Sequence, residues 1–95
     1  MRGSGGNTVK RITIVEDQTI LLDSLASAID SEADFMVVDK LTNAADIHRS
    51  LRLHPADLVL MDVVTENSSG LKESAKLKAE HPNLKVVVFT AMPDA

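Results

Sequence analysis

The sequence predicts an α/β domain built on a doubly wound parallel sheet of four strands and three helices. From Val9 onward, short runs of β-branched and other apolar residues alternate with segments of helical periodicity, which is the pattern of consecutive βαβ units. The strand-like runs are apolar nearly throughout, as is typical of strands covered on both faces. A chain of 95 residues with 44% hydrophobic side chains fits one small domain and leaves no room for a second.

Four apolar segments are predicted to form the strands. They are residues 11–15, 36–39, 57–61 and 85–90. No apolar run approaches the ~20 residues that a helix needs to cross a bilayer, so no membrane span is expected.

Three helices are predicted between the strands, over residues 20–30, 44–53 and 71–80. The first two carry apolar residues at helical spacing, which marks the face that packs on the sheet, whereas the third has only two large apolar residues. These residues are Leu22, Leu25 and Ile29 in the first helix, Ala44, Ile47 and Leu51 in the second, and Leu71 and Leu77 in the third. Thr42 and Asn43 precede the second helix as candidate N-caps.

The second and third helices have the same predicted ending. His54-Pro55 and His81-Pro82 stand at these ends, and proline cannot continue a helix. A histidine in the last turn interacts favourably with the negative end of the helix, so we expect this structural role for both histidines. His48 is expected to be a surface residue in the middle of its helix.

The composition excludes several classes of function. Ten Lys and Arg against fourteen Asp and Glu give a net charge of -4, and no basic run or aromatic cluster is present to bind a phosphate backbone. Direct nucleic-acid binding is therefore not expected. The absence of cysteine excludes disulfides and thiolate sites, which fits the cytoplasm, and any metal is expected on oxygen ligands. Residues 1–8 are interpreted as a tag or flexible leader and residues 9–95 as the domain.

Acidic and hydroxyl side chains stand at the carboxyl ends of three predicted strands. Glu16 and Asp17 follow the first strand, Asp62 follows the third and Thr90 ends the fourth, whereas nothing marks Asp39 of the second strand as reactive. Ligands of open parallel sheets gather beyond these ends, and adjacent strands lie ~4.8 Å apart, so one shared pocket is expected. Three close carboxylates favour a bound cation, and Mg²⁺ suits oxygen donors. The alternative is a purely structural role, with Asp17 as N-cap of the first helix.

Taken together, these motifs resemble the receiver (CheY-like) domain of bacterial two-component response regulators. The resemblance covers Val9 to Met92 and rests on ITIVED, DLVLMD, Gly70 and VVVFTA in this order. The DLVLMD strand, the AEHPNLKVVVFT segment and the F-x-V-V of the second strand look most like the LuxR/NarL-type subfamily, which carries a DNA-binding module downstream. The resemblance implies a flavodoxin-like sheet with strand order 2-1-3-4 in this chain.

The resemblance also implies a role for each site residue. Asp62 corresponds to the phosphoacceptor, and Mg²⁺ is held by Glu16, Asp17, Asp62 and the backbone carbonyl of Val64. Thr90 corresponds to the switch hydroxyl. The implied partner is a sensor histidine kinase, and the implied output is transcription regulation by a cytoplasmic signalling module rather than an enzyme.

The chain departs from the family pattern in three ways. Thr65 and Glu66 stand where family members have Met-Pro, and Val64 is apolar where many relatives are polar, which leaves the lifetime of the acyl phosphate open. The chain ends at Ala95, so we expect a receiver truncated before its last strand and helix. The lysine that pairs with the phosphoryl group is expected in that missing part, which puts phosphorylation of this chain in question. The other lysines assigned to predicted elements, none of which replaces it, are Lys72, Lys76, Lys78 and Lys85.

Truncation predicts self-association. In the implied strand order, the apolar residues 86–89 form an unprotected edge, and unprotected edges pair with other chains. We expect a homo-oligomer, most simply a dimer, which could form by strand exchange.

Two other functions stay open. One is an Mg²⁺-dependent phosphohydrolase of haloacid dehalogenase type, although Asp62 here lacks the Asp-x-Asp pattern. The other is an engineered or degenerate fragment that acts only through self-association.

Overall fold

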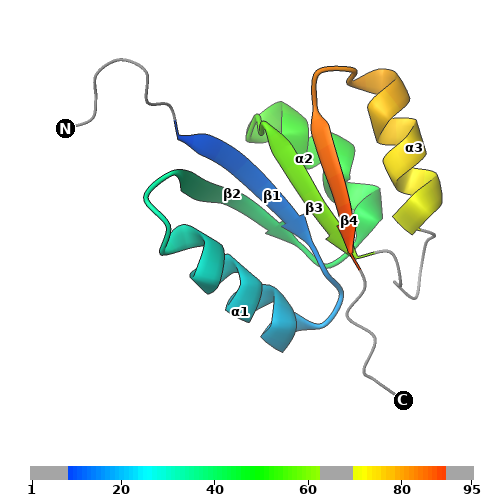
Figure 1. Ribbon diagram of the computed structural model, residues 1–95. Coiled ribbons are helices and arrows are strands. Elements are labelled where there is room, and N and C mark those ends of the chain that lie inside the picture. The colour runs from blue at the N-terminus through cyan, green and yellow to red at the C-terminus, as the bar shows by residue number, and fades with distance from the viewer. Residues whose placement is uncertain (1–8, 63–69, 90–95) are drawn as a thin grey trace.

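The computed structural model describes residues 9–62 and 70–89, which form four parallel strands and three α-helices in the predicted alternation (Figure 1). The elements are β1 (Lys10–Val15), α1 (Thr19–Asp30), β2 (Phe35–Leu41), the 3-10 turn η1 (Ala44–Asp46), α2 (Ile47–Leu53), β3 (Leu58–Asp62), α3 (Gly70–Glu80) and β4 (Lys85–Phe89). The leader expected at residues 1–8 lies outside the described residues.

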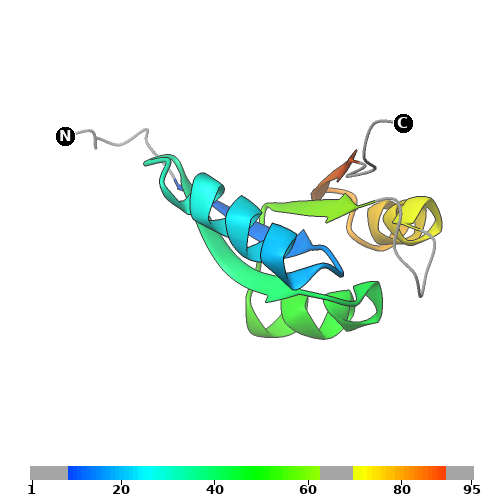
Figure 2. The ribbon, with the colours of Figure 1, turned by 90° about the horizontal axis from the view of Figure 1, so that it is seen from below.

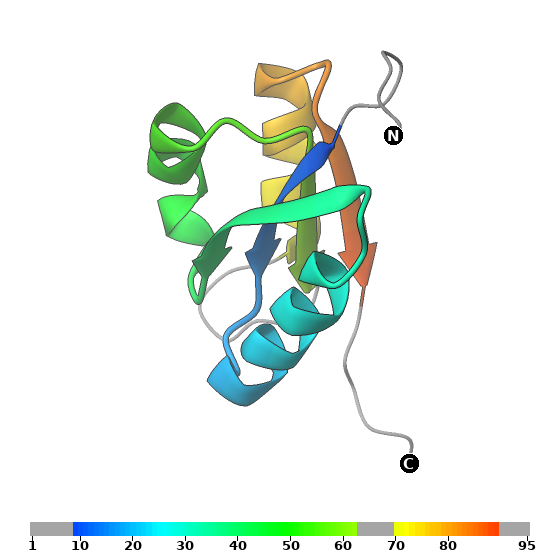
Figure 3. The same cartoon turned by 90° about the vertical axis from the view of Figure 1, so that its left-hand side faces the viewer.

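The strands follow the order β2-β1-β3-β4, and every neighbouring pair is parallel. Figure 3 shows the four arrows pointing the same way. Both the predicted fold class and the predicted strand order are therefore confirmed. In register, Val15 of β1 lies beside Met61 of β3, and Asp62 lies beside Phe89 of β4. The carboxyl ends of these three strands consequently meet at one edge of the sheet.

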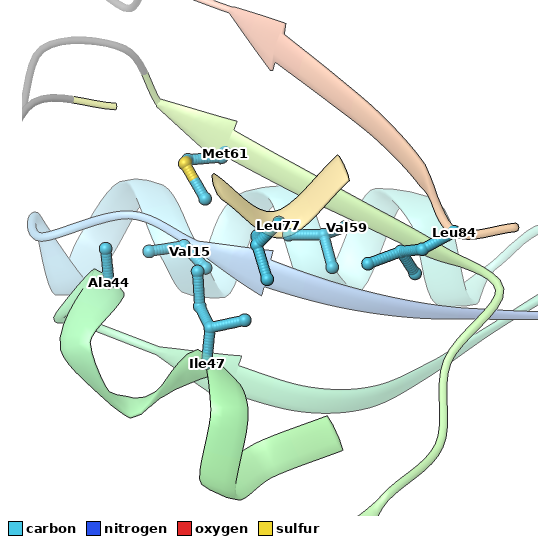
Figure 4. Packing of buried hydrophobic residues seen from close by; sticks show 7 residues of the cluster. All are labelled: Val15, Ala44, Ile47, Val59, Met61, Leu77 and Leu84. Carbon is cyan, nitrogen blue, oxygen red and sulfur yellow. The ribbon is translucent and has the colours of Figure 1, made fainter. Parts of the chain in front are cut away.

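Helices cover the two faces of the sheet unequally. The cluster under α1 contains Ile12 and Ile14 of β1, whereas Val15 of the same strand belongs to the cluster under α2 and α3, because side chains alternate along a strand. Figure 4 shows this second cluster, and Figure 2 shows α3 beside β4 and away from α1. Its members are Val15, Ala44, Ile47, Val59, Met61, Leu77 and Leu84. Burial of such side chains is the main force holding the layers together.

The outer strands differ from the prediction that all strands are covered on both faces. Within the described part of the chain β4 is the last strand of the sheet, and Val87 and Val88 are 45% and 37% exposed. On the opposite side, Phe35 and Met36 at the start of β2 are 39% and 44% exposed.

β2 is longer than predicted and contains a bulge. Ile12 pairs with Val37 but Thr13 pairs with Asp39, so Val38 is the extra residue. The bulge puts Val37 against α1 and Asp39 against α2, although two residues in this spacing would otherwise share a face. The apolar side chain of Val37 and the acidic side chain of Asp39 therefore lie on opposite faces of the sheet.

The helix boundaries differ slightly from those predicted. The segment predicted as one helix over 44–53 divides into η1 and α2, and Asn43 caps it as expected, with its Oδ1 accepting from the amide of Ala45 at 2.9 Å. α2 ends at Leu53 and α3 at Glu80, so His54 and His81 directly follow the helices instead of lying in their last turns. None of the described helices is long and apolar enough to span a bilayer.

Strand β3 begins one residue later than predicted, since Asp57 precedes it. Oδ2 of Asp57 accepts from the amide of Arg11 at 2.8 Å, and the side-chain Nε of Arg11 donates to the carbonyl of Pro55 at 2.6 Å. These contacts join the entries to β1 and β3 at the amino edge of the sheet. Asp57 therefore has a structural role far from the carboxyl edge.

Candidate functional site

Three carboxylates meet at the carboxyl edge of the sheet. Glu16 and Asp17 directly follow β1, Asp62 is the last residue of β3, and one carboxylate oxygen from each lies within 4.8 Å of the others. The register explains the meeting, because the pairing of Val15 with Met61 makes the next two residues, Glu16 and Asp62, neighbours. The amide of Glu16 still donates to the carbonyl of Leu41 in β2, which holds this residue in line with the sheet.

The carboxylates are withdrawn from solvent to different extents. Glu16 is 0% exposed and Asp62 is 3% exposed, while Asp17 is half-buried. Burying ionised carboxylates side by side is costly unless a cation or hydrogen bonds compensate. The cluster is therefore an unusual arrangement for residues with a purely structural role.

Glu16 carries the clearest electrostatic signature. Its Oε2 accepts from the amide of Gln18 at 2.9 Å, whereas its buried Oε1 has no hydrogen-bond partner among the described residues. The pKa of Glu16 is raised from 4.5 to about 7, mainly by burial and also by the nearby Asp62 and Asp17 carboxyl groups, while the hydrogen bond from Gln18 opposes the rise. Near neutral pH a proton therefore occupies this carboxyl group about half of the time, and a bound cation would displace it.

The donor set fits a hard divalent cation. All three side chains offer oxygen, and Asp17, which is only half-buried, leaves the cluster open to solvent on its side. Mg²⁺ binds carboxylate oxygens and keeps several water molecules, so a partly open cluster of this kind suits it. The buried Oε1 of Glu16 is an acceptor that such an ion or its water could satisfy.

Two predicted site residues, Val64 and Thr90, lie outside the described residues, as do Thr65 and Glu66. Their roles stay predictions. The pairing of Asp62 with Phe89 means that the carboxyl end of β4 reaches the level of Asp62.

Asp17 is not the N-cap of α1. Gln18 occupies that position, makes no side-chain cap hydrogen bond, and has its own amide bound by Glu16. The structural alternative for Asp17 is therefore wrong in this form. At the start of α1 the carboxylate of Glu16, not that of Asp17, accepts a hydrogen bond from a backbone amide. The sequence alone suggests only a metal-binding role for Glu16.

Other charged residues near the sheet ends have structural roles. Asp39 accepts from its neighbouring amide, that of Lys40, and from the buried hydroxyl of Ser50 in α2 at 2.6 Å, in agreement with the view that it is not reactive. The Lys40 ammonium pairs with Asp23 of α1 at 3.0 Å. Among the lysines considered for the phosphate-pairing role, Lys78 donates to the carbonyls of Pro82 and Leu84.

Sequence reasoning missed a second group of metal-ligating side chains. His48 of α2 lies beside Glu80 and His81 at the end of α3, with one donor atom of each within 4.8 Å of the others. The histidines are far apart in sequence, and only the packing of α2 against α3 brings them together. From the sequence, only oxygen ligands are expected for a metal ion, whereas this group offers two imidazoles as well as a carboxylate.

A doubly wound parallel sheet with clustered acids at its carboxyl edge is the arrangement of a receiver domain, and comparison with known proteins agrees. The response regulator receiver domain family matches residues 12–95, and the chain belongs to this family. The match gives no support to the haloacid dehalogenase alternative.

Individual relatives cover nearly the whole chain. An uncharacterized transcriptional regulatory protein, YvfU of Bacillus subtilis, is 35% identical over 81 residues, which are 84% of this chain and 40% of that protein. A protein-glutamate methylesterase/protein-glutamine glutaminase of Rhodospirillum centenum is 25% identical over 89 residues, 94% of this chain and 23% of that protein. The chain thus spans well under half the length of these relatives.

The structural comparison supports the fold. A crystal structure of a LuxR-family two-component response regulator from Aurantimonas sp. SI85-9A1 superposes with a TM-score of 0.81 at 21% identity, covering 90% of this chain and 61% of the other.

Proposed function

We propose that the chain is a phosphoacceptor module that takes a phosphoryl group onto Asp62 with the help of Mg²⁺. The residues that would hold the ion are Glu16, Asp17, Asp62 and, through its backbone carbonyl, Val64. The observation that carries the proposal is the gathering of three acidic side chains at the carboxyl edge of the sheet, two of them nearly fully buried. Membership of the receiver family supports the same function.

The chemistry follows from the positions of these side chains. A carboxylate oxygen of Asp62 attacks the phosphorus of a phosphohistidine in line; the phosphorus–nitrogen bond breaks, its electron pair stays on the imidazole, and an acyl phosphate forms. Mg²⁺, when bound, supplies positive charge that offsets repulsion between the carboxylates and the phosphoryl group. The carboxylate of Glu16, held in place by the hydrogen bond from the Gln18 amide, would face the ion from the buried side of the pocket and balance part of its positive charge.

The output is proposed to follow from added charge. Phosphorylation adds roughly -1.5 to -2 charges near neutrality together with strong acceptor oxygens, to which the Thr90 hydroxyl would donate. This new hydrogen bond would bias a two-state surface near the end of β4. The name of YvfU, a transcriptional regulatory protein, supports transcription regulation as the output of a longer LuxR/NarL-type protein. The proposed donor is a sensor histidine kinase, and the proposed location of the chain is the cytoplasm.

Within this proposal the domain acts as a signalling module, and neither nucleic acid nor a membrane is its direct partner. The net charge of -4 supports this choice, because a phosphate backbone would be repelled. A second copy of the chain is a further proposed partner. The exposed valines of β4 support pairing at this strand.

Intact-mass measurement tests the phosphoacceptor proposal. The chain is incubated with Mg²⁺ and acetyl phosphate, and a single labile phosphoryl adduct is expected. Asp62→Asn should abolish the adduct because the nucleophilic oxygen is lost. Asp34→Asn, an exposed acid just before β2, is the matched control and should keep it.

Two results would contradict the proposal. One is an adduct of equal yield on the Asp62→Asn variant. The other is the absence of any adduct under conditions where Mg²⁺ binding to the chain has been demonstrated. Steady turnover of acetyl phosphate without an adduct would indicate hydrolysis instead.

A further inference from the structure

His48, Glu80 and His81 form a compact group on the helical face of the molecule that the phosphoacceptor proposal does not use. Nδ1 of His48 lies 3.4 Å from Oε1 of Glu80, and the two imidazole rings have centroids 6.1 Å apart and planes inclined by 30°. One donor atom of each residue lies within 4.8 Å of the other two. We propose that this group is a binding site for a divalent transition metal ion, with Zn²⁺ the best fit.

The distances agree with a tetrahedral ion. Zn²⁺ binds imidazole nitrogen and carboxylate oxygen at roughly 2.0–2.2 Å, which separates two ligand atoms of a tetrahedral site by about 3.3–3.5 Å. The observed 3.4 Å between His48 and Glu80 lies in this range. The donor atoms of the remaining pairs lie within 4.8 Å of each other. Small side-chain rotations would bring them to the separation of a tetrahedral site.

The chemistry of the donors selects the kind of ion. Two imidazoles and one carboxylate suit Zn²⁺ and similar borderline ions, whereas Mg²⁺ prefers oxygen ligands. An ion pair alone would account for His48 beside Glu80, but it would not require the second imidazole. Three protein ligands also leave a fourth position for water, as in open zinc sites.

The backbone around the ligands is held in place before any ion binds. Ile47, which precedes His48, and Leu77, one turn before His81, are both 0% exposed and belong to the same core cluster. The amide of His81 donates to the carbonyl of Leu77 at 2.7 Å, and its carbonyl accepts from the amide of Leu84 at 3.0 Å. Preorganised ligands lose less conformational entropy on binding, which favours affinity.

The group borders open space. A hollow of ≈ 360 Å³ lies next to the two histidines and is lined as well by Arg52, Asp57 and Asn83. His48 and His81 are each half-buried, so an ion could enter from the hollow and keep a water ligand there.

The site lies away from the acidic cluster. α3 begins toward the carboxyl edge of the sheet and ends at the amino edge, where Glu80 and His81 precede β4 (Figure 1). An ion bound there would connect α2 with the end of α3 and would stabilise the folded chain by an amount that grows with the logarithm of the free ion concentration once this exceeds the dissociation constant.

Zinc titration by calorimetry tests the proposal on the full chain. Saturating Mg²⁺ is present throughout, so that the acidic cluster around Asp62 is not available to zinc. One equivalent of Zn²⁺ is expected to bind, and His48→Ala, His81→Ala and Glu80→Gln should each weaken binding by more than about tenfold. His54→Ala is the matched control, because His54 is the third histidine of the chain and is exposed.

A second readout separates lost binding from lost folding. Circular dichroism without metal establishes that each variant is folded, and Zn²⁺ should then raise the Tm of the wild type and of His54→Ala but not of His48→Ala. Co²⁺ as a probe should give the intense visible bands of a tetrahedral site in the same two proteins. Zinc binding that survives both histidine substitutions, that is lost in Glu16→Gln, or that is absent from the wild type would overturn the assignment.

Discussion

Glu16 is the residue whose surroundings say most about the candidate site. It is completely buried at the end of β1, and its pKa rises from 4.5 to about 7, mainly through burial. Sequence reasoning could place Glu16 near Asp62, since both follow parallel strands. It could not predict the burial of Oε1 or the hydrogen bond from Gln18, because both depend on how the chain turns into α1.

The raised pKa predicts a pH-dependent stability of the metal-free chain. Between about pH 4.5 and about pH 7 the folded state keeps the proton of Glu16 while the unfolded state loses it. The stabilisation is therefore fully present below pH 4.5 and is lost as the pH rises through about 7. Urea unfolding in the presence of a chelator should show the free energy of unfolding falling over this interval.

Glu16→Gln is the control for this prediction, because glutamine does not titrate. In that variant the same interval should show a smaller decline, leaving only the contributions of other groups. A wild-type free energy of unfolding that declines between these pH values no more than that of the variant would contradict the assignment of the raised pKa to Glu16.

At the scale of elements, the strands were predictable and their details were not. Uninterrupted apolar runs located β1, β3 and β4 to within one residue. No residue pattern in the sequence indicates the bulge at Val38. The bulge is linked to tertiary packing, because it turns Val37 toward α1 and Asp39 toward α2. The division of the second helix into η1 and α2 likewise depends on local capping by Asn43.

A part-buried hydrogen bond connects β2 with α2. The hydroxyl of Ser50, which is 3% exposed, donates to Oδ2 of Asp39 at 2.6 Å. Ser50→Ala leaves this carboxylate oxygen without its donor, and we expect a loss of about 1–3 kcal/mol in the free energy of unfolding. Urea unfolding at neutral pH measures it.

Ser24→Ala is the matched control, because Ser24 is an exposed residue in the middle of α1. Its effect should stay within about 0.5 kcal/mol. Equal free energies of unfolding for Ser50→Ala and wild type would show that the hydrogen bond to Asp39 adds nothing to stability.

At the scale of the whole molecule, the strand order came from the family resemblance and agrees with the structure. The second metal-ligating group could not come from the sequence, since His48 and His81 meet only through the packing of α2 and α3. The edge position of β4 in the described sheet was also predicted, and its exposed valines follow from it.

The exposed edge predicts self-association through β4. Light scattering after size-exclusion chromatography should give a mass that rises toward a dimer with concentration. Val87→Lys should shift the chain to the monomer, because a charge on an edge strand opposes pairing with another strand. Leu53→Lys, which removes an exposed apolar side chain from α2 instead, should leave the association unchanged. A monomeric wild type at high concentration would remove this proposal.

A Mg²⁺ titration followed by amide NMR shows directly whether the three carboxylates act as one metal-binding pocket. If Glu16, Asp17 and Asp62 form one metal-binding pocket, a single ion should bind, and the largest shift changes should fall on these residues and their neighbours at the carboxyl edge. The double variant Asp17→Asn/Asp62→Asn should lose this response, while Asp34→Asn should keep it. Unchanged Mg²⁺ affinity in the folded double variant would show that these carboxylates do not form a magnesium site.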